Sequence, residues 1–174
     1  NWQGTYQGHV VLPLGVYRQR MQKLAANRLS EEHAGRLLDK IAQSKRPLLY
    51  VGGGAVQGEA TREVREFSKA FGIPVVTTLM GIGAVDTHDA LSLRMLGMHG
   101  AAFANYAVED CDLLLTIGAR FDDRVAGLPS RFAPNAKVIA QFDIDPAEIN
   151  KVKPVQWHHV GELQEALRTV MALG

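Results

Sequence analysis

Glycines cluster directly after short apolar segments of this 174-residue sequence, which contains 17 glycines in all. Gly52-Gly53-Gly54 follows one segment, Gly81 and Gly83 follow another, and Gly118 ends a third. Because glycine has no Cβ, the chain can turn tightly and a ligand can reach main-chain N–H groups. Where a helix begins next, those groups and the helix dipole favour phosphate. Any one of these glycines could serve only a turn, but together they predict a phosphate-binding edge.

Charged side chains follow Gly118 within a few positions. The segment continues as Ala119-Arg120-Phe121-Asp122-Asp123-Arg124. Arginine can bind phosphate and aspartate can bind a ribose, although the same side chains could pair with one another. Since the adjoining glycine opens the backbone, we expect this segment to bind the anionic part of a ligand.

The pattern Gly52-x-Gly54-x-x-x-Gly58 is a loose relative of the dinucleotide-binding fingerprint G-x-G-x-x-G. In ordinary NAD sites an acidic residue about 20 positions later binds the adenosine ribose. Here the corresponding strand ends in the neutral pair Thr77-Thr78, and the carboxylate that could meet a ribose is Asp143. The sequence therefore predicts a dinucleotide that is bound differently from NAD.

The segment Met95-Leu96-Gly97-Met98-His99-Gly100 combines soft apolar side chains with a histidine. Methionine is polarizable and suits the face of a planar ring. Ordinary core packing is the competing interpretation, and for the methionines alone we favour it.

Residues for covalent or metal catalysis are not evident. No serine or cysteine occupies a nucleophile elbow, and no H-E-x-x-H motif occurs. Cys111, the single cysteine, is expected to be a small buried apolar residue. His158 and His159 are adjacent on a predicted strand and should point to opposite faces, so they should not share a metal. We predict no catalytic residue and no metal site.

Helical and strand patterns alternate along the chain and would position these residues. Ser30 can cap a helix with Ala34, Leu37, Leu38 and Ile41 on one face. Further helices are predicted over residues 60–71, 99–109 and 161–172, with a helix start at Asp145, and strands over residues 48–51, 74–78, 112–118, 136–145 and 155–160. The alternation predicts a doubly wound α/β fold: a mostly parallel sheet with helices on both faces, a Rossmann-like three-layer α/β/α arrangement. Ligands of such sheets bind outside the carboxyl ends of the strands, where the glycines lie.

The composition is that of one soluble globular domain, with 47% hydrophobic and 21% charged residues. The net charge of +1 provides no basic field for nucleic acid or an acidic membrane, and no apolar run approaches the roughly 18 residues of a membrane span.

We expect residues 1–29 to be a linker or inter-domain segment with a short helix, and residues 30–174 to form the domain. Both ends indicate a piece of a larger protein.

Several longer motifs occur in one order along the chain. They are Thr77-Thr78-Leu79-Met80-Gly81-Ile82-Gly83, Met95-Leu96-Gly97-Met98-His99-Gly100, Ala104-Asn105-Tyr106-Ala107-Val108, Gly118-Ala119-Arg120-Phe121-Asp122-Asp123-Arg124-Val125 and Asp143-Ile144-Asp145-Pro146-Ala147-Glu148-Ile149. Over roughly residues 45–170 the chain resembles the central, FAD-binding domain of the acetohydroxyacid synthase (acetolactate synthase) catalytic subunit.

This resemblance implies a three-domain enzyme of branched-chain amino-acid biosynthesis that decarboxylates pyruvate and joins the product to a second 2-keto acid. The central domain would hold FAD as a structural cofactor, whereas thiamine diphosphate and Mg²⁺ would bind in flanking domains. The glutamate that activates thiamine and the segment that holds Mg²⁺ have no counterpart among these residues. The chain alone should therefore not catalyse the reaction.

The resemblance also implies which residues bind FAD. Gly52, Gly53 and Gly54 would approach the pyrophosphate and ribityl groups, Thr78, Leu79 and Met80 would line the flavin side, and Leu96, Gly97, Met98 and His99 would lie near the isoalloxazine. Gly118, Ala119, Arg120, Phe121, Asp122, Asp123 and Arg124 would hold the phosphate and ribose, Asp143 and Ile144 the adenosine end, and Glu162 and Leu163 the adenine. The family usually has Asp where this chain has Glu162. Met98, His99, Asp123 and Arg124 also match positions that border the family's substrate channel.

The implied partners are the flanking thiamine-binding domains of the same chain, a second copy in a homodimer or tetramer, and a regulatory small subunit, with no nucleic acid and no membrane. The implied compartment is the bacterial cytoplasm, or a plastid if a transit peptide was removed. Two alternatives stay open. One is another FAD-containing thiamine enzyme, such as glyoxylate carboligase or pyruvate oxidase, and the other is a non-catalytic nucleotide-binding module.

Overall fold

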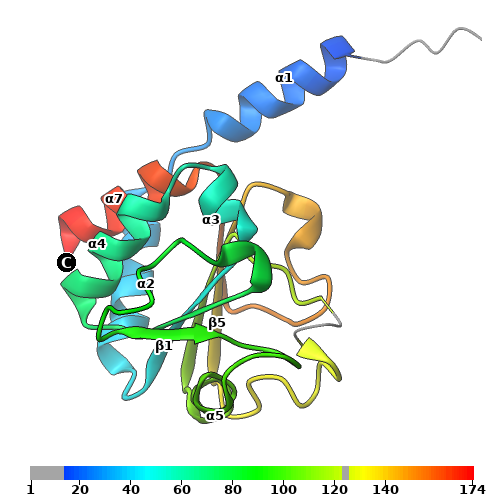
Figure 1. Cartoon of the computed structure of the whole chain (residues 1–174). Coiled ribbons are helices and arrows are strands. Elements are labelled where there is room, and N and C mark those ends of the chain that lie inside the picture. Colours follow the sequence, from blue (N-terminus) through cyan, green and yellow to red (C-terminus); the bar gives the residue numbers. More distant parts are fainter. Residues whose placement is uncertain (1–13, 123–125) are drawn as a thin grey trace, which may run out of the picture.

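Helices and strands alternate through the computed structural model, which describes residues 14–122 and 126–174 (Figure 1). The elements are α1 (Leu14–Ala25), α2 (Glu31–Gln43), β1 (Pro47–Val51), α3 (Gly53–Gln57), α4 (Thr61–Phe71), β2 (Val75–Thr77), η1 (Leu79–Gly81), β3 (Ser92–Met95), α5 (Ala102–Asp110), β4 (Leu113–Ile117), β5 (Val138–Asp143), η2 (Pro146–Glu148), β6 (Trp157–Val160) and α7 (Leu163–Leu173), where η1 and η2 are 3₁₀ turns.

The strands form one six-stranded sheet in the order β3-β2-β1-β4-β5-β6, and every pair of neighbours is parallel. Successive strand residues face opposite sides: Leu49 and Val51 pack with α2, α4 and α7, whereas Leu48 and Tyr50 pack with α5. In Figure 1, α2, α4 and α7 group on one side of the molecule and α5 lies away from them. The predicted doubly wound α/β fold is confirmed.

Local signals begin and end the helices much as the sequence predicts. The Ser30 hydroxyl accepts from the His33 N–H at the start of α2. Gly72, with φ of 63°, ends α4 in the left-handed conformation that glycine adopts without strain. The Asp145 carboxylate caps Pro146–Glu148 by accepting from the Ala147 N–H, although this element is only a single 3₁₀ turn.

The hydrophobic pattern of the sequence does not predict two of the elements. β3 is a half-exposed edge strand in which Arg94 has a φ of 62° and the register against β2 shifts, so its apolar alternation is broken. The short helix α3 begins within the glycine cluster, where helix propensity is low. The sequence therefore indicates a turn at Gly52-Gly53-Gly54 but not the helix that leaves it.

Cys111 and the pair His158-His159 lie as the sequence predicts. Cys111 is buried, and its burial is the main cause that raises the pKa of the thiol to about 12. His158 is exposed whereas His159 is buried.

Across residues 14–122 and 126–174, no cluster of His, Cys, Asp or Glu is suited to a metal ion, and none of the helices combines the length and apolarity that crossing a membrane requires.

The predicted linker contains α1, which projects away from the rest of the molecule (Figure 1). Its apolar residues Leu14, Tyr17 and Met21 are exposed. Closer to α2, however, Leu29 is buried in the core and the Asn27 side chain bonds to β6. Packing of the domain thus begins before residue 30.

Asp112 fastens the start of β1 to the start of β4. Its carboxylate accepts from the Ser44 hydroxyl and from the N–H groups of Lys45 and Arg46, both at 2.9 Å. Burial opposes ionisation of Asp112, but these hydrogen bonds outweigh it and lower the pKa from 3.8 to about 2.

Asp112→Asn should lower the free energy of unfolding by about 1–2 kcal/mol at neutral pH. Because the pKa is lower in the folded state, the charged carboxylate adds stability above pH 3.8 and loses this effect as the pH falls toward about 2. Urea unfolding across this pH range measures the difference, which should shrink on acidification. Asp39→Asn, on the exposed surface of α2, is the control, and a loss that does not change with pH contradicts the expectation.

Candidate functional site

A cavity of about 960 Å³ opens at the carboxyl edge of the sheet. It lies where β1 and β4 are neighbours and the strand order changes direction, which is where doubly wound sheets bind their ligands. The volume is near the upper end of ordinary ligand sites, which are roughly 300–1,000 Å³. The lining residues are Gly52, Gly53, Gly54, Gln57, Gly58, Thr78, Leu79, Met80, Gly118, Ala119, Arg120, Asp122, Asp143, Ile144, Gly161, Glu162 and Leu163.

The glycines after β1 and β4 bring two loops into backbone contact beneath this cavity. The N–H of Gly54 donates to the carbonyl of Gly118 at 2.9 Å, and a Cβ on Gly54 would lie 2.8 Å from the Gly118 Cα. Gly118 has a φ of 54°, and its own Cβ would lie 2.7 Å from the Ala55 nitrogen. The main reason for glycine at positions 54 and 118 is that the two loops touch there, and access for a ligand is a secondary reason.

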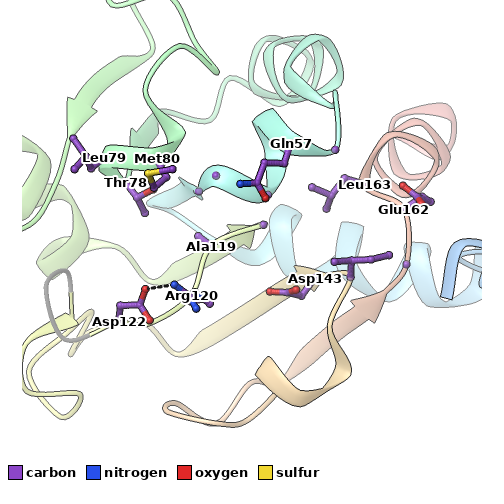
Figure 2. Close-up of a pocket in the computed structure, with 17 residues that line it drawn as sticks. Gln57, Thr78, Leu79, Met80, Ala119, Arg120, Asp122, Asp143, Glu162 and Leu163 are labelled. Carbon is purple, nitrogen blue, oxygen red and sulfur yellow. Dashed lines mark hydrogen bonds and ion pairs between the residues drawn. The ribbon is translucent and has the colours of Figure 1, made fainter. Parts of the chain in front are cut away.

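One end of the cavity is apolar (Figure 2). Leu79 and Met80 are 67% and 66% exposed, so these large side chains form an uncovered wall. Their turn is set by Thr78, whose hydroxyl accepts from the Gly81 N–H at 3.1 Å. A Cβ on Gly53 would meet the Met80 Cβ at 2.9 Å, so the glycine loop lies directly against this wall.

The opposite end is acidic, with Asp143 and Glu162 on neighbouring segments (Figure 2). Asp143 is only 8% exposed and accepts from the Asp145 N–H at 2.9 Å. Its burial is the main cause that raises the pKa of the carboxyl, and the nearby charges of Glu148 and Asp145 act in the same direction. A buried carboxylate at a cavity wall suits the hydroxyl groups of a ribose, because these donors replace the lost water.

Among the described residues that line this cavity, Arg120 carries the positive charge. Its guanidinium pairs with the Asp122 carboxylate at 2.9 Å, and both side chains are largely exposed. The backbone beneath is fixed, since the buried Tyr50 hydroxyl donates to the Arg120 carbonyl at 2.7 Å. An exposed pair of this kind contributes little stability, so the guanidinium can exchange its partner for an anionic ligand at small cost.

Most residues that the sequence predicts as the binding site meet around this cavity. Those that do so are Gly52, Gly53, Gly54, Thr78, Leu79, Met80, Gly118, Ala119, Arg120, Asp122, Asp143, Ile144, Glu162 and Leu163. Phe121 does not line it, because its side chain is buried against Tyr50 and Phe132. Asp123 and Arg124 lie outside the residues that the structure describes.

The predicted residues Leu96, Gly97, Met98 and His99 also do not line the cavity. Leu96 is buried, whereas Met98 and His99 are exposed. Their loop is held by Asn105, whose side chain accepts from the Gly97 N–H at 2.8 Å and donates to the Gly97 carbonyl at 3.0 Å.

Gln57, Gly58 and Gly161 line the cavity without having been predicted to bind. Gly58 belongs to the glycine pattern that begins at Gly52, and Gly161 follows a strand as Gly118 does. The rule that glycines after strands mark the binding edge would have found Gly161, and the spacing from Gly52 would have found Gly58. Gln57 carries no comparable signal.

Comparison with known proteins places the chain in a family. Residues 34–170 match the model described as the thiamine pyrophosphate enzyme, central domain. The acetolactate synthase large subunit of Parasynechococcus marenigrum (strain WH8102) is 52% identical over 136 residues, which are 78% of this chain and 22% of that protein. The chloroplastic acetolactate synthase 1 of Zea mays is 49% identical over 163 residues, or 93% of this chain and 24% of that protein.

The chain thus spans about a fifth to a quarter of the length of these relatives. The resemblance predicted from the ordered motifs is confirmed by identities near one half over most of the chain. This chain belongs to the family of thiamine pyrophosphate enzyme central domains.

Proposed function

We propose that this chain is the FAD-binding central domain of an acetohydroxyacid synthase. The observation that carries the proposal is the cavity at the β1–β4 switch point, whose lining includes most residues that the resemblance assigns to FAD. The high identity to acetolactate synthases supports the choice of this enzyme within the family.

The polarity of the cavity fits FAD in one orientation (Figure 2). The isoalloxazine would lie over Leu79 and Met80, because an uncovered apolar wall suits a planar ring. The pyrophosphate would lie between the two glycine loops and Arg120. The adenosine would reach Asp143 and residues 161–163. The predicted contacts from Leu96, Gly97, Met98 and His99 require the ring to extend beyond the cavity toward their loop.

FAD in this domain would be structural, and the full-length protein would supply the chemistry. Thiamine diphosphate and Mg²⁺ would bind in flanking domains, where pyruvate is decarboxylated and joined to a second 2-keto acid. We propose the same partners as the resemblance implies, namely the flanking domains, further copies of the chain and a regulatory subunit. A bacterial cytoplasm or a plastid would be the compartment, and chloroplastic relatives exist.

FAD should bind to the purified 174-residue chain, and the fluorescence of the flavin should be quenched on binding. At a concentration of about 100 Kd it should stabilise the fold by about 2.7 kcal/mol, which corresponds to a rise in melting temperature of roughly 5–10 °C. NAD is the matched control and should give no shift, because Thr77 and Thr78 replace the expected acidic residue.

Two results would contradict parts of this proposal. Absence of FAD binding, together with no stabilisation by ADP, would favour a nucleotide site that is unused. If FAD binds but the full-length polypeptide does not form acetolactate from pyruvate, the result would instead favour another FAD-containing thiamine enzyme.

A further inference from the structure

The segment that follows α1 and continues into the first turn of α2 braces the edge strand β6. We call residues 27–33 the N-terminal brace. Asn27 Nδ2 donates to the Val160 carbonyl at 2.5 Å, and the His33 ring bonds through Nε2 to the His158 carbonyl at 2.8 Å. β6 has β5 on one side only, so the brace satisfies carbonyls at the otherwise open edge.

The brace is also held by Trp157 and by the core. The Trp157 indole donates to the His33 carbonyl at 2.9 Å, and the two rings stack with centroids 4.8 Å apart. Leu29 is buried among core residues of α2 and α7. These contacts hold the backbone of the brace against β6, although the Asn27 side chain is exposed.

Asn27 reaches the wall of the cavity through Val160 and Gly161. A Cβ on Gly161 would lie 2.7 Å from the main-chain carbonyl oxygen of Asn27 and 2.6 Å from His159 Nε2. Gly161 therefore fits closely between these two residues. The Gly161 N–H donates to the carbonyl of Asp143 at 3.0 Å. Gly161, Glu162 and Asp143 all line the acidic end of the cavity.

We propose that Asn27 is a positioning residue for this end of the cavity, and that it sets the affinity for the adenine half of a bound dinucleotide. This inference rests on the proposed function, because it needs a dinucleotide in the cavity. Its physical basis is that a wall on an edge strand moves unless its outer carbonyls are held. Asn27 holds the carbonyl next to Gly161.

The test compares Asn27→Ala with a matched asparagine variant in the purified 174-residue chain. Asn135 also donates its side-chain amide to a backbone carbonyl, that of Glu109, at 2.8 Å, but it does not line the cavity. Asn27→Ala should raise the Kd for both FAD and ADP by about five- to tenfold, the equivalent of one hydrogen bond. Asn135→Ala should leave both Kd values unchanged within about twofold.

Asn27→Asp separates hydrogen bonding from packing. It keeps the size of the side chain but replaces the N–H donor with a carboxylate oxygen, so it should weaken the binding of ADP at least as much as Asn27→Ala does. At saturating FAD, the absorption spectrum of the bound flavin should be the same in wild type and in both Asn27 variants, because the flavin end is distant from the brace. A general loosening of the fold would change this spectrum as well.

The outcomes distinguish the two proposals. If the wild-type chain binds neither FAD nor ADP, both the proposed function and the role of Asn27 are overturned. If the wild type binds and Asn27→Ala matches Asn135→Ala, only the role of Asn27 is overturned. An altered flavin spectrum in the Asn27 variants overturns it too, because the effect then is not confined to the adenine end.

Discussion

Gly118→Ala should abolish tight FAD binding, raising the Kd more than about tenfold, and should destabilise the fold by about 3 kcal/mol. The left-handed conformation at φ of 54° costs a residue with a Cβ roughly 1–2 kcal/mol. The remainder comes from contact, since the new Cβ would lie 2.7 Å from the Ala55 nitrogen and 2.8 Å from the Gly54 Cα. One loop must then move away from the other, and the cavity between them changes shape. Urea unfolding and FAD titration measure the two effects.

Gly72→Ala is the matched control for this variant. Gly72 has a similar φ of 63°, but a Cβ there would meet nothing within 4 Å. It should therefore cost only the conformational part, about 1–2 kcal/mol, and leave the Kd for FAD unchanged. Equal losses of stability in the two variants, or normal FAD binding by Gly118→Ala, would show that contact between the two loops does not shape the site.

Arg168→Ala should lower the free energy of unfolding by about 2–3 kcal/mol. The Glu63 side chain on α4 is 3% exposed and accepts from Arg168 Nε on α7 at 3.0 Å and also from Arg168 Nη2. Removing Arg168 leaves a buried carboxylate, and among the described residues the exposed Arg62 at 3.3 Å is then its remaining ionic partner. Because Arg62 remains and Arg168 is itself 54% exposed, the loss should fall below that of a fully buried pair.

Three comparisons test this interpretation. The double variant Glu63→Met, Arg168→Met should lose less stability than Arg168→Ala, because no charge is left buried. Arg36→Ala, which breaks the exposed pair with Glu32 on α2, should cost at most about 0.5 kcal/mol. A double variant as unstable as the single one would indicate that packing, rather than the unpaired charge, causes the loss.

Acid should weaken this pair in wild type. Burial opposes ionisation of Glu63, but the hydrogen bonds and charge of Arg168, helped by a backbone hydrogen bond and the charge of Arg62, outweigh it and hold the pKa below the usual value of 4.5. The pair therefore adds stability above pH 4.5, and this contribution is lost as the pH falls through the lowered pKa. The difference between wild type and Arg168→Ala should become smaller on acidification.

Prediction from sequence succeeded where the signals are local or periodic. The buried strand over residues 113–117 shows a run that is apolar except for Thr116, and Ser30 and Gly72 carry the chemistry that begins and ends a helix. It failed at β3, because an edge strand with one positive φ lacks both burial and alternation. The family resemblance assigns Phe121 to the ligand together with the rest of its motif, whereas its side chain packs in the core against Tyr50 and Phe132.

The amino-acid sequence by itself determined the parallel α/β fold, the edge of the sheet at which the cavity opens and the family, because each depends on the order of residues along the chain. Only the tertiary structure decided that Gly52, Gly54 and Gly118 bring two loops together, since contact between backbones distant in sequence leaves no pattern in either segment. It also decided that the Asn27 side chain bonds to the Val160 carbonyl, next to Gly161 in the cavity wall. That contact joins residues 133 positions apart through a single hydrogen bond to a carbonyl, a group that every residue possesses.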